Sequence, residues 1–298
     1  MSDGEELQPE REARIRIGAE DFRRMGHRLV DDVAELLATM PDRPVTPGEM
    51  PPAVQKFLGA GHALPEDGTD PEALLKETTD LLFDHSLFNG HPRFFGYITS
   101  SPAHIGILGD LLASAINPNV GAWVLSPVAT EIEHQSVAWI AELLNYPTDC
   151  GGLLVSGGNM ANMVGLWAAR TAQAGAHVRV SGMRGGAQLR AYVSEETHTW
   201  IEKASDLSGL GTDAVRWIAT DDAQRMNVDA LRKQISDDRA AGDQPFMVVG
   251  TGGSVSTGLV DPLPEIAALC RDEDLWFHVD GAYGGFAVVS PDAPDDLR

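Results

Sequence analysis

The stretch LWFHVDGAYGG at residues 275–285 joins a short apolar run to a carboxylate and a glycine-rich turn. An apolar run without alternation is typical of a strand in a parallel sheet whose two faces are both covered. Asp280 would then lie at the carboxyl end of this strand, where open α/β sheets bind their ligands. Taken by itself, Asp280 is more often a turn former or the cap of the next helix, so the upstream sequence has to decide.

Upstream of this stretch, short apolar runs alternate with helical patterns from residue 151 onward. Strands and helices that alternate in this way form βαβ units with right-handed connections. We therefore expect an α/β fold in which helices are wound around a mainly parallel sheet. The expected strands are 153–155, 191–194, 215–219 and 246–249, and the expected helices are 160–174, 197–207, 228–241 and 263–271.

The residues before 151 contain helical patterns and connectors instead. Apolar residues recur every three or four positions across 17–40, which predicts an amphipathic helix. The prolines of 41–52 predict an extended connector after it. This helix and arm could pack against a second subunit or against their own domain, and the sequence leaves both open. Further helices are expected at 71–88 with Asp70 as cap, at 105–115, and at 126–144, where Thr130 and Glu133 have capping-box spacing.

The charge of the chain is strongly negative, because 44 acidic residues against 22 basic ones give a formal net charge of −22 over 298 residues. Such a field repels phosphate backbones and anionic membranes, so we expect no nucleic-acid and no membrane partner. No apolar run is long enough for a membrane span, and the N-terminus has no signal-peptide pattern. The two cysteines, Cys150 and Cys270, fit a reducing compartment, and we expect a cytoplasmic protein.

Four polar features fall at or after the carboxyl ends of expected strands. The sequence SGGN (156–159) opens a helix whose free N–H groups can hold an anion, while its paired glycines allow close approach. His198 follows a strand and could stack on a ring or act as an acid or base. The loop at 250–258 is rich in Gly, Ser and Thr and could wrap a ligand. His278 and Asp280 have strand spacing, but no third ligand accompanies them, so we expect no metal.

Together these features describe a site for a phosphorylated aromatic heterocycle, although singly they are more often plain turns or surface side chains. The glycines would take the phosphate, an aromatic side chain could cover one ring face, and the carboxylate would face the far edge of the ring. Pyridoxal 5'-phosphate fits this description. A carboxylate beside its pyridine nitrogen keeps that nitrogen protonated and makes the ring an electron sink.

Six motifs carry a family resemblance: HPRFFGY (91–97), SPVATEIE (126–133), SGGNMANMVGLWAAR (156–170), YVSEETHTWIEKA (192–204), GSVSTGLVDPL (253–263) and HVDGAYGG (278–285). In this order and spacing the chain resembles the group II pyridoxal-phosphate-dependent decarboxylases, the aromatic-L-amino-acid decarboxylase family of fold type I. The resemblance covers residues 17–298. We expect a disordered tail at 1–16, an N-terminal helical segment and arm at 17–90, and a large domain that binds the cofactor at 91–298.

The resemblance implies which residues hold the cofactor and the substrate. His198 would stack on the ring and Asp280 would pair with the pyridine nitrogen, so these are the expected catalytic residues. Tyr97 and Ile98 would shape the substrate pocket with residues of a second subunit, which implies a homodimer with its active site at the interface. The other cofactor-binding residues would be Gly157, Gly158 and Asn159 at the phosphate, with Ser254, Val255 and Ala282 near the ring.

Three positions depart from the family pattern. Asn159 stands where many members have Ser. Ile98 and Thr99 replace a Phe-Pro pair of the aromatic-substrate members, and Gly121 stands where those members are bulkier. The last two departures bear on the side chain of the substrate and leave the reaction class unchanged.

The family's Schiff-base lysine lies downstream of the strand that carries Asp280, in an Asp-x-His-Lys-type motif. The lysines of this chain all fall in expected helices, and none follows a strand; they are Lys56, Lys76, Lys203 and Lys233. We therefore expect the 298 residues to be truncated before that lysine and before a C-terminal small domain. Such a chain could not link the cofactor covalently by itself.

The activity implied by the resemblance is pyridoxal-phosphate-dependent decarboxylation of an L-amino acid, with an aromatic one preferred, to its amine and CO2. Fold type I also hosts aminotransferases, oxidative deaminases and lyases, so another reaction on the same cofactor is one alternative. A non-catalytic homologue that acts as a partner subunit is another.

Overall fold

The computed structural model describes residues 15–175, 177–183 and 185–298. The chain divides into two compact units, of which the first ends at Leu111 and the second begins at Leu112. Most of the expected tail, residues 1–14, lies outside the described residues. The expected boundary near residue 90 stays a prediction.

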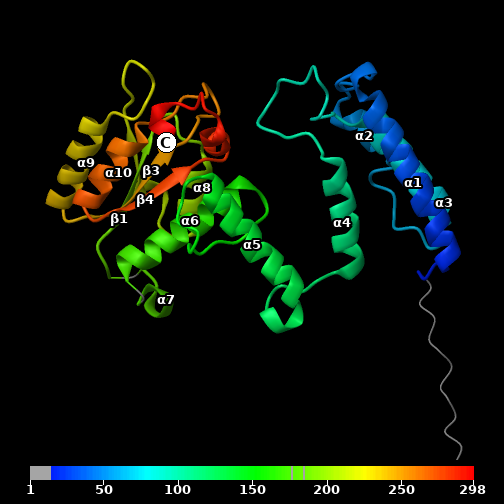
Figure 1. Cartoon of the computed structure of the whole chain (residues 1–298), viewed down its shortest axis with the longest axis horizontal. Helices are drawn as coiled ribbons and strands as arrows, with labels where there is room; N and C mark the ends of the chain where they lie inside the picture. The colour runs from blue at the N-terminus through cyan, green and yellow to red at the C-terminus, as the bar shows by residue number, and fades with distance from the viewer. Residues whose placement is uncertain (1–14, 176, 184) are drawn as a thin grey trace, which may run out of the picture. The chain divides into compact units, whose positions relative to one another are not determined.

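The first unit is helical. In it α1 (Ala19–Thr39) lies beside α3 (Pro71–His85), and Arg24 and Arg28 of α1 form ion pairs with Glu72 (Figure 1). The carboxylate of Asp70 caps α3 as expected, because it accepts a hydrogen bond from the Ala73 N–H at 2.9 Å. α1 thus packs within its own unit, although Phe22 and other apolar side chains on it stay exposed.

The expected extended connector at 41–52 is partly wrong. Met40–Asp42 forms a single 3-10 turn, and the last two prolines begin a short helix, α2 (Pro51–Phe57). Proline suits the first turn of a helix, because the N–H that it lacks would have no partner there.

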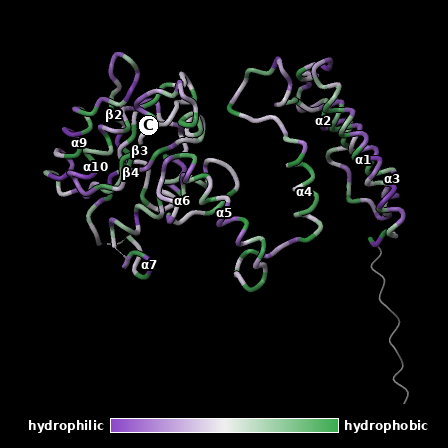
Figure 2. The backbone as a smooth tube through the Cα atoms, in the orientation of Figure 1, coloured by the Kyte–Doolittle hydropathy of each residue, from purple (hydrophilic) through white to green (hydrophobic). Residues whose placement is uncertain are grey.

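Two further helices follow, α4 (His104–Ile116) and α5 (Pro127–Leu143). Figure 2 shows α4 as largely hydrophobic, yet none of its residues is buried. The capping box expected at Thr130 and Glu133 is wrong, since α5 already begins at Pro127. The Thr130 hydroxyl donates to the Ser126 carbonyl at 2.9 Å, and Glu133 accepts a hydrogen bond from the Leu154 N–H at 2.8 Å.

Within the described residues, the second unit contains a four-stranded parallel sheet in the order β2-β1-β3-β4, which confirms the expected α/β architecture. The strands are β1 (Leu189–Ser194), β2 (Val215–Ile218), β3 (Gln244–Thr251) and β4 (Trp276–Asp280). Ser194 pairs with Ile218, and Thr251 pairs with Asp280, so the carboxyl ends of the strands share one edge of the sheet.

Helices cover both faces of this sheet (Figure 1). Ala191 and Val193 of β1 pack in a core with α6 (Gly157–Ala174) and α8 (Trp200–Leu207). Tyr192, between them, faces a second core with α9 (Val228–Ala240) and α10 (Leu263–Asp272). Because strand side chains alternate between faces, the two cores lie on opposite sides of the sheet. A short helix that the sequence did not predict, α7 (Val178–Ser181), follows α6.

Three expectations in this unit are wrong. Residues 153–155 form no strand, because no described strand pairs with them; Leu153 and Leu154 are more than half exposed. β4 forms the edge of the described sheet, where it pairs with β3 alone, and Val279 is exposed although coverage of both faces was expected. The helix expected from residue 197 begins at Trp200. No helix of the described chain is both long enough and apolar enough to cross a membrane.

Candidate active site

The glycine turn (residues 156–159) leads into the first turn of α6. Gly157 has a φ of +80°, a conformation that favours glycine. Ser156 precedes the helix and makes no side-chain capping bond. The first N–H groups of α6 have no partner within the helix and lie at its positive end, so this turn can hold an anion.

Asp280, at the end of β4, lies close to this turn. Its side chain belongs to a residue that is only 7% exposed, and its Oδ1 accepts a hydrogen bond from the Ala282 N–H at 3.2 Å. A Cβ added to Gly158 would lie 3.6 Å from the Ala282 Cβ. The N-terminal end of α6 and the segment that carries the buried carboxylate are therefore neighbours.

The loop at 252–258 packs against the same segment. The Gly252 N–H donates to the Asp280 carbonyl at 2.8 Å. Gly253 has a φ of +104°, and a Cβ there would come within 3.1 Å of the Gly284 backbone, so only glycine fits this approach. Ser254 is buried, with its Oγ 2.7 Å from the Thr257 Oγ1. Val255 is exposed.

The turn after β1 carries His198 to the same edge. The His198 side chain is exposed, and its Nδ1 accepts a hydrogen bond from the Trp200 N–H at 3.2 Å. Nearby, the Ser256 hydroxyl donates to Glu196 across the two loops. The four features expected from the sequence are thus gathered at one edge of the sheet, although the strand expected before the glycine turn does not form.

The two expected substrate residues lie in the first unit. Tyr97 is 87% exposed with a φ of +57°, and Ile98 is also exposed. Both belong to the loop between α3 and α4. Their roles stay predictions.

His278 has a partner that the sequence did not predict. Its Nε2 lies 2.7 Å from the Asn162 Oδ1 of α6, and its ring meets Trp200 edge to face with centroids 5.7 Å apart. Burial lowers the pKa of His278, and the opposing charge of Asp280 offsets only part of this shift. Within the described chain, no group of three or more His, Cys, Asp or Glu side chains could bind a metal.

Asp261 is a second buried carboxylate that the sequence did not single out. Its two oxygens accept hydrogen bonds from the N–H groups of Met226 and Thr251, both at 2.8 Å. Burial raises its pKa, and these backbone bonds counteract part of the rise. Both carboxylate oxygens of Asp261 therefore join β3 to the loop before α9. Within the described residues, the Asp280 carboxylate by contrast makes only a local bond, to the turn that follows it.

The lysines lie where the sequence predicted. All four are exposed and lie in helices: Lys56 in α2, Lys76 in α3, Lys203 in α8 and Lys233 in α9. Lys76 and Lys233 form ion pairs with the carboxylates four residues on, Asp80 and Asp237.

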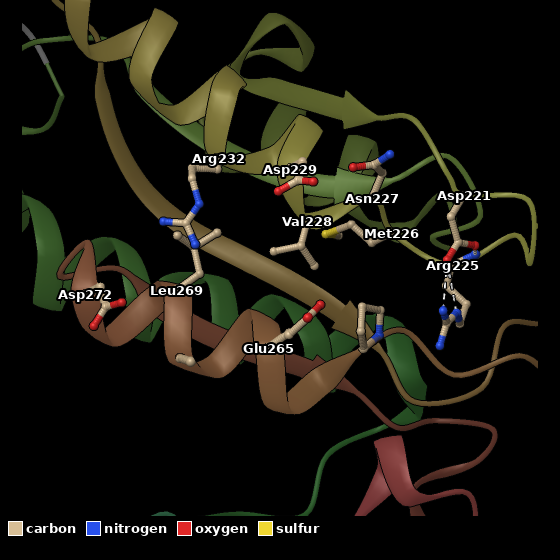
Figure 3. Close-up of a pocket in the computed structure, with 12 residues that line it drawn as sticks. Asp221, Arg225, Met226, Asn227, Val228, Asp229, Arg232, Glu265, Leu269 and Asp272 are labelled. Carbon is tan, nitrogen blue, oxygen red and sulfur yellow. Dashed lines mark hydrogen bonds and ion pairs between the residues drawn. The ribbon is translucent and has the colours of Figure 1, made fainter.

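A separate hollow of about 370 Å³ lies between α9 and α10 (Figure 3). Asp221 and Arg225, which form an ion pair at its rim, lie with Asp229, Arg232 and Glu265 among its lining residues. These helices cover the face of the sheet opposite to α6 and α8, and no expected site residue lines the hollow.

The residues at the sheet edge fit pyridoxal phosphate. An anion-holding helix end suits its phosphate, and a buried carboxylate a short distance away suits a basic ring nitrogen. His198 is exposed beside them, free to cover a ring face.

Comparison with known proteins agrees with this geometry. Residues 54–297 match the family described as the pyridoxal-dependent decarboxylase conserved domain. Over 276 residues the chain is 32% identical to an aromatic-L-amino-acid decarboxylase of Bacillus atrophaeus; the match covers 93% of this chain and 55% of that protein. The chain thus spans about half the length of this curated relative.

Solved structures are similar over nearly the whole chain. Oryza sativa TDC with PLP has a TM-score of 0.84 and 29% identity, covering 98% of this chain and 62% of that one. Rhodiola rosea 4-hydroxyphenylacetaldehyde synthase has a TM-score of 0.84 and 30% identity, covering 94% and 61%. These likenesses confirm the expected fold type of the pyridoxal-phosphate enzymes. The chain belongs to the pyridoxal-dependent decarboxylase family.

Proposed function

We propose that this site binds pyridoxal phosphate and that the protein carrying this chain decarboxylates an L-amino acid, preferably an aromatic one, to its amine and CO2. The observation that supports this most is the approach of the first turn of α6 to the segment after Asp280, with Gly158 and Ala282 in near contact. A helix end that could hold an anion and a buried carboxylate are neighbours there, which supports the proposal.

Each residue of the site would have one task. The N–H groups of the glycine turn would hold the phosphate, while Ser254, Val255 and Ala282 would line the ring. Asp280 would keep a proton on the ring nitrogen, and its low exposure would strengthen that ionic bond because little water screens it. His198 would cover a ring face and hold a proton near the substrate. When bound, pyridoxal phosphate supplies an electron sink for a carbanion at the α-carbon of the substrate.

The cofactor would not be linked by any of the four lysines of this chain, since all of them are exposed on helices. The resemblance puts the linking lysine downstream of Asp280. Binding at this site is therefore expected to be non-covalent, and any cofactor that borohydride fixes on this chain would be attached to the exposed lysines of its helices and not at the site.

We also propose a cytoplasmic homodimer with the active site at the subunit interface, where Tyr97 and Ile98 would shape the substrate pocket. An apolar hollow of about 240 Å³ in the first unit supports the dimer; it is lined by side chains of α1 and α4, among them Leu29, Val33 and Leu108. Beside it, Leu108, Leu111 and Leu112 of α4 are at least half exposed, and contiguous exposed apolar surface marks protein interfaces. Leu108→Asp is expected to give a monomer in sedimentation, and an unchanged dimer would contradict this interface.

A binding experiment tests the cofactor assignment. Pyridoxal phosphate bound in a chiral site gains circular dichroism in its own absorption band, which is absent for the free molecule. Asp280→Asn should weaken binding about tenfold or more, because a neutral amide no longer favours the protonated nitrogen. Asp292→Asn removes the same charge from an exposed position and should leave binding unchanged. Equal affinities of the two variants would overturn the role of Asp280.

A product assay separates the reactions. The protein carrying this chain would be supplied with pyridoxal phosphate and with L-tyrosine or L-tryptophan, and CO2, amine, aldehyde and ammonia would be measured. Decarboxylation gives CO2 and amine in equal amounts. An aldehyde with ammonia would favour oxidative deamination, the rival that the likeness to an aldehyde synthase supports. Cofactor binding without any product would favour a non-catalytic homologue.

A further inference from the structure

One hydrogen bond joins the two elements that carry the candidate site. The imidazole Nε2 of His278, in β4, lies 2.7 Å from the Oδ1 of Asn162, in α6. Asn162 is 7% exposed and lies one helical turn after Gly158, about 6 Å along the helix axis. His278 lies two strand residues before Asp280, about 6.6 Å along the strand. The bond therefore joins α6 and β4 inside the unit, one helical turn from Gly158 and two strand residues from Asp280.

The imidazole of His278 packs against both α6 and α8. A Cβ at Gly165 would come within 2.6 Å of the imidazole, so the ring lies directly on the helix backbone there. The edge of the ring meets Trp200 of α8, which is 1% exposed. With the Asn162 Oδ1 as the acceptor of this bond, the hydrogen of the neutral ring would be on Nε2. Burial lowers the pKa of His278 and so favours this neutral form.

We propose that Asn162 and His278 are positioning residues that set the separation between the phosphate-holding turn of α6 and the carboxylate of Asp280. This inference rests on the proposed function, since it concerns a ligand with an anionic group at one end and a basic ring nitrogen at the other. A ligand that contacts both ends gains affinity only if their separation is fixed beforehand. A ligand that contacts one end alone does not depend on the separation.

Two ligands distinguish these cases. Pyridoxine 5'-phosphate has the phosphate and the ring nitrogen but no aldehyde, so it cannot react with surface lysines. Inorganic phosphate contacts only the turn of α6. Dissociation constants would be measured by titration calorimetry for the first and by competition against it for the second, with the chain as it is. Asn162→Leu and His278→Leu remove the bond, while His278→Gln keeps an N–H donor near the place of Nε2.

The two leucine variants are expected to bind pyridoxine phosphate about tenfold more weakly, because the two ends of the site are no longer held at one separation, with phosphate affinity unchanged. His278→Gln is expected to restore most of the affinity. Tyr192→Phe is the matched control: it removes another buried hydrogen bond of the same unit, from Tyr192 to Asp238 at 3.0 Å, on the opposite face of the sheet. It should change neither constant.

Other outcomes overturn the inference. If both ligands weaken in parallel, or if Tyr192→Phe behaves like Asn162→Leu, the bond has only a structural role. If pyridoxine phosphate binds all variants equally, the bond does not determine the separation between the turn of α6 and the Asp280 carboxylate. Circular dichroism reports folding, and if Asn162→Leu does not fold, His278→Leu against His278→Gln makes the same comparison. If the unmodified chain binds no pyridoxine phosphate, the cofactor assignment itself fails. The unmodified chain alone gives this result, so it is distinct from a failure of the inference about Asn162 and His278.

Discussion

The hydroxyl oxygens of Thr197 and Thr251 lie 3.3 Å apart, and both residues are buried. Thr251 is the last residue of β3, and Thr197 precedes His198 in the turn after β1. The same Thr197 Oγ1 accepts a hydrogen bond from the Ser194 N–H at 3.1 Å. One hydroxyl thus attaches the turn that carries His198 to two strands of the sheet.

Thr197→Val is expected to destabilise the second unit by about 1–2 kcal/mol, because the Ser194 N–H loses its acceptor in a buried place. All six tryptophans of the chain lie in that unit, so urea unfolding followed by tryptophan fluorescence reports on it alone. Thr199→Val, two residues on, changes an exposed threonine that forms no capping bond and serves as the control. Equal free energies of unfolding for the two variants would contradict this role of Thr197.

Asp261→Asn should cost about 1–3 kcal/mol in the same measurement, although it removes no volume. The two oxygens of Asp261 accept from two different N–H groups, and an amide can offer an oxygen to only one of them. The second N–H then faces an NH2 donor. Asp222→Asn, in the exposed part of the loop before α9, is the matched control and should be neutral. If Asp261→Asn leaves the free energy of unfolding unchanged, the loop before α9 rearranges freely and the role of Asp261 is contradicted.

The sequence predicted the sheet well because its strands carry local signals. β1 and β3 are short apolar runs between helical patterns, and the structure extends each by two or more residues. Residues 153–155 carry the same local signal and form no strand, because a strand also needs a neighbour with free backbone groups. The Leu154 N–H finds Glu133 instead, which a capping-box pattern had assigned to its own helix.

The sequence singled out the residues of the candidate site that follow strands, but not the contacts that support them inside the fold. Asp280 follows a strand that forms, so parallel topology brings it to the expected edge. The glycine turn follows residues that form no strand, and it reaches the same edge through the packing of α6 on the sheet. The bond between Asn162 and His278 spans 116 positions of sequence and has no periodic signal. In the sequence Asn162 is one polar residue of a helix, and the spacing of His278 from Asp280 suggested only a possible metal ligand. Such contacts become visible when the helix is docked on the sheet.

The two cysteines should differ in reactivity. Both are free; Cys270 is buried in α10, and burial raises its pKa to about 12, whereas Cys150 is partly exposed. Because the thiolate is the nucleophile, a disulfide reagent at pH 8 should modify one thiol of the native chain and two after unfolding in urea. Cys150→Ser should abolish the reaction of the native chain. Two fast thiols in the native chain would mean that α10 opens readily.

The stability of the second unit should fall between neutral and mildly acidic pH, and His278 should contribute to this fall. Burial lowers its pKa in the folded chain, while the charge of Asp280, on its own strand, opposes that shift. The side chains that meet it from α6 and α8, Asn162 and Trp200, carry no charge.

The sign of the effect follows from proton binding. As the pH falls below about 6.5, the ordinary pKa of histidine, the unfolded chain takes up a proton at His278 before the folded chain does. The stabilisation from the neutral ring is therefore complete above that pH and is lost progressively down to the lowered pKa of the folded chain.

His278→Gln has no titrating ring, so its free energy of unfolding should fall less between pH 7.5 and pH 5 than that of the unmodified chain. Urea unfolding at both pH values, with the unmodified chain as the reference, measures this difference. A dependence as steep in His278→Gln as in the unmodified chain would show that the ring takes up its proton equally well in the folded state.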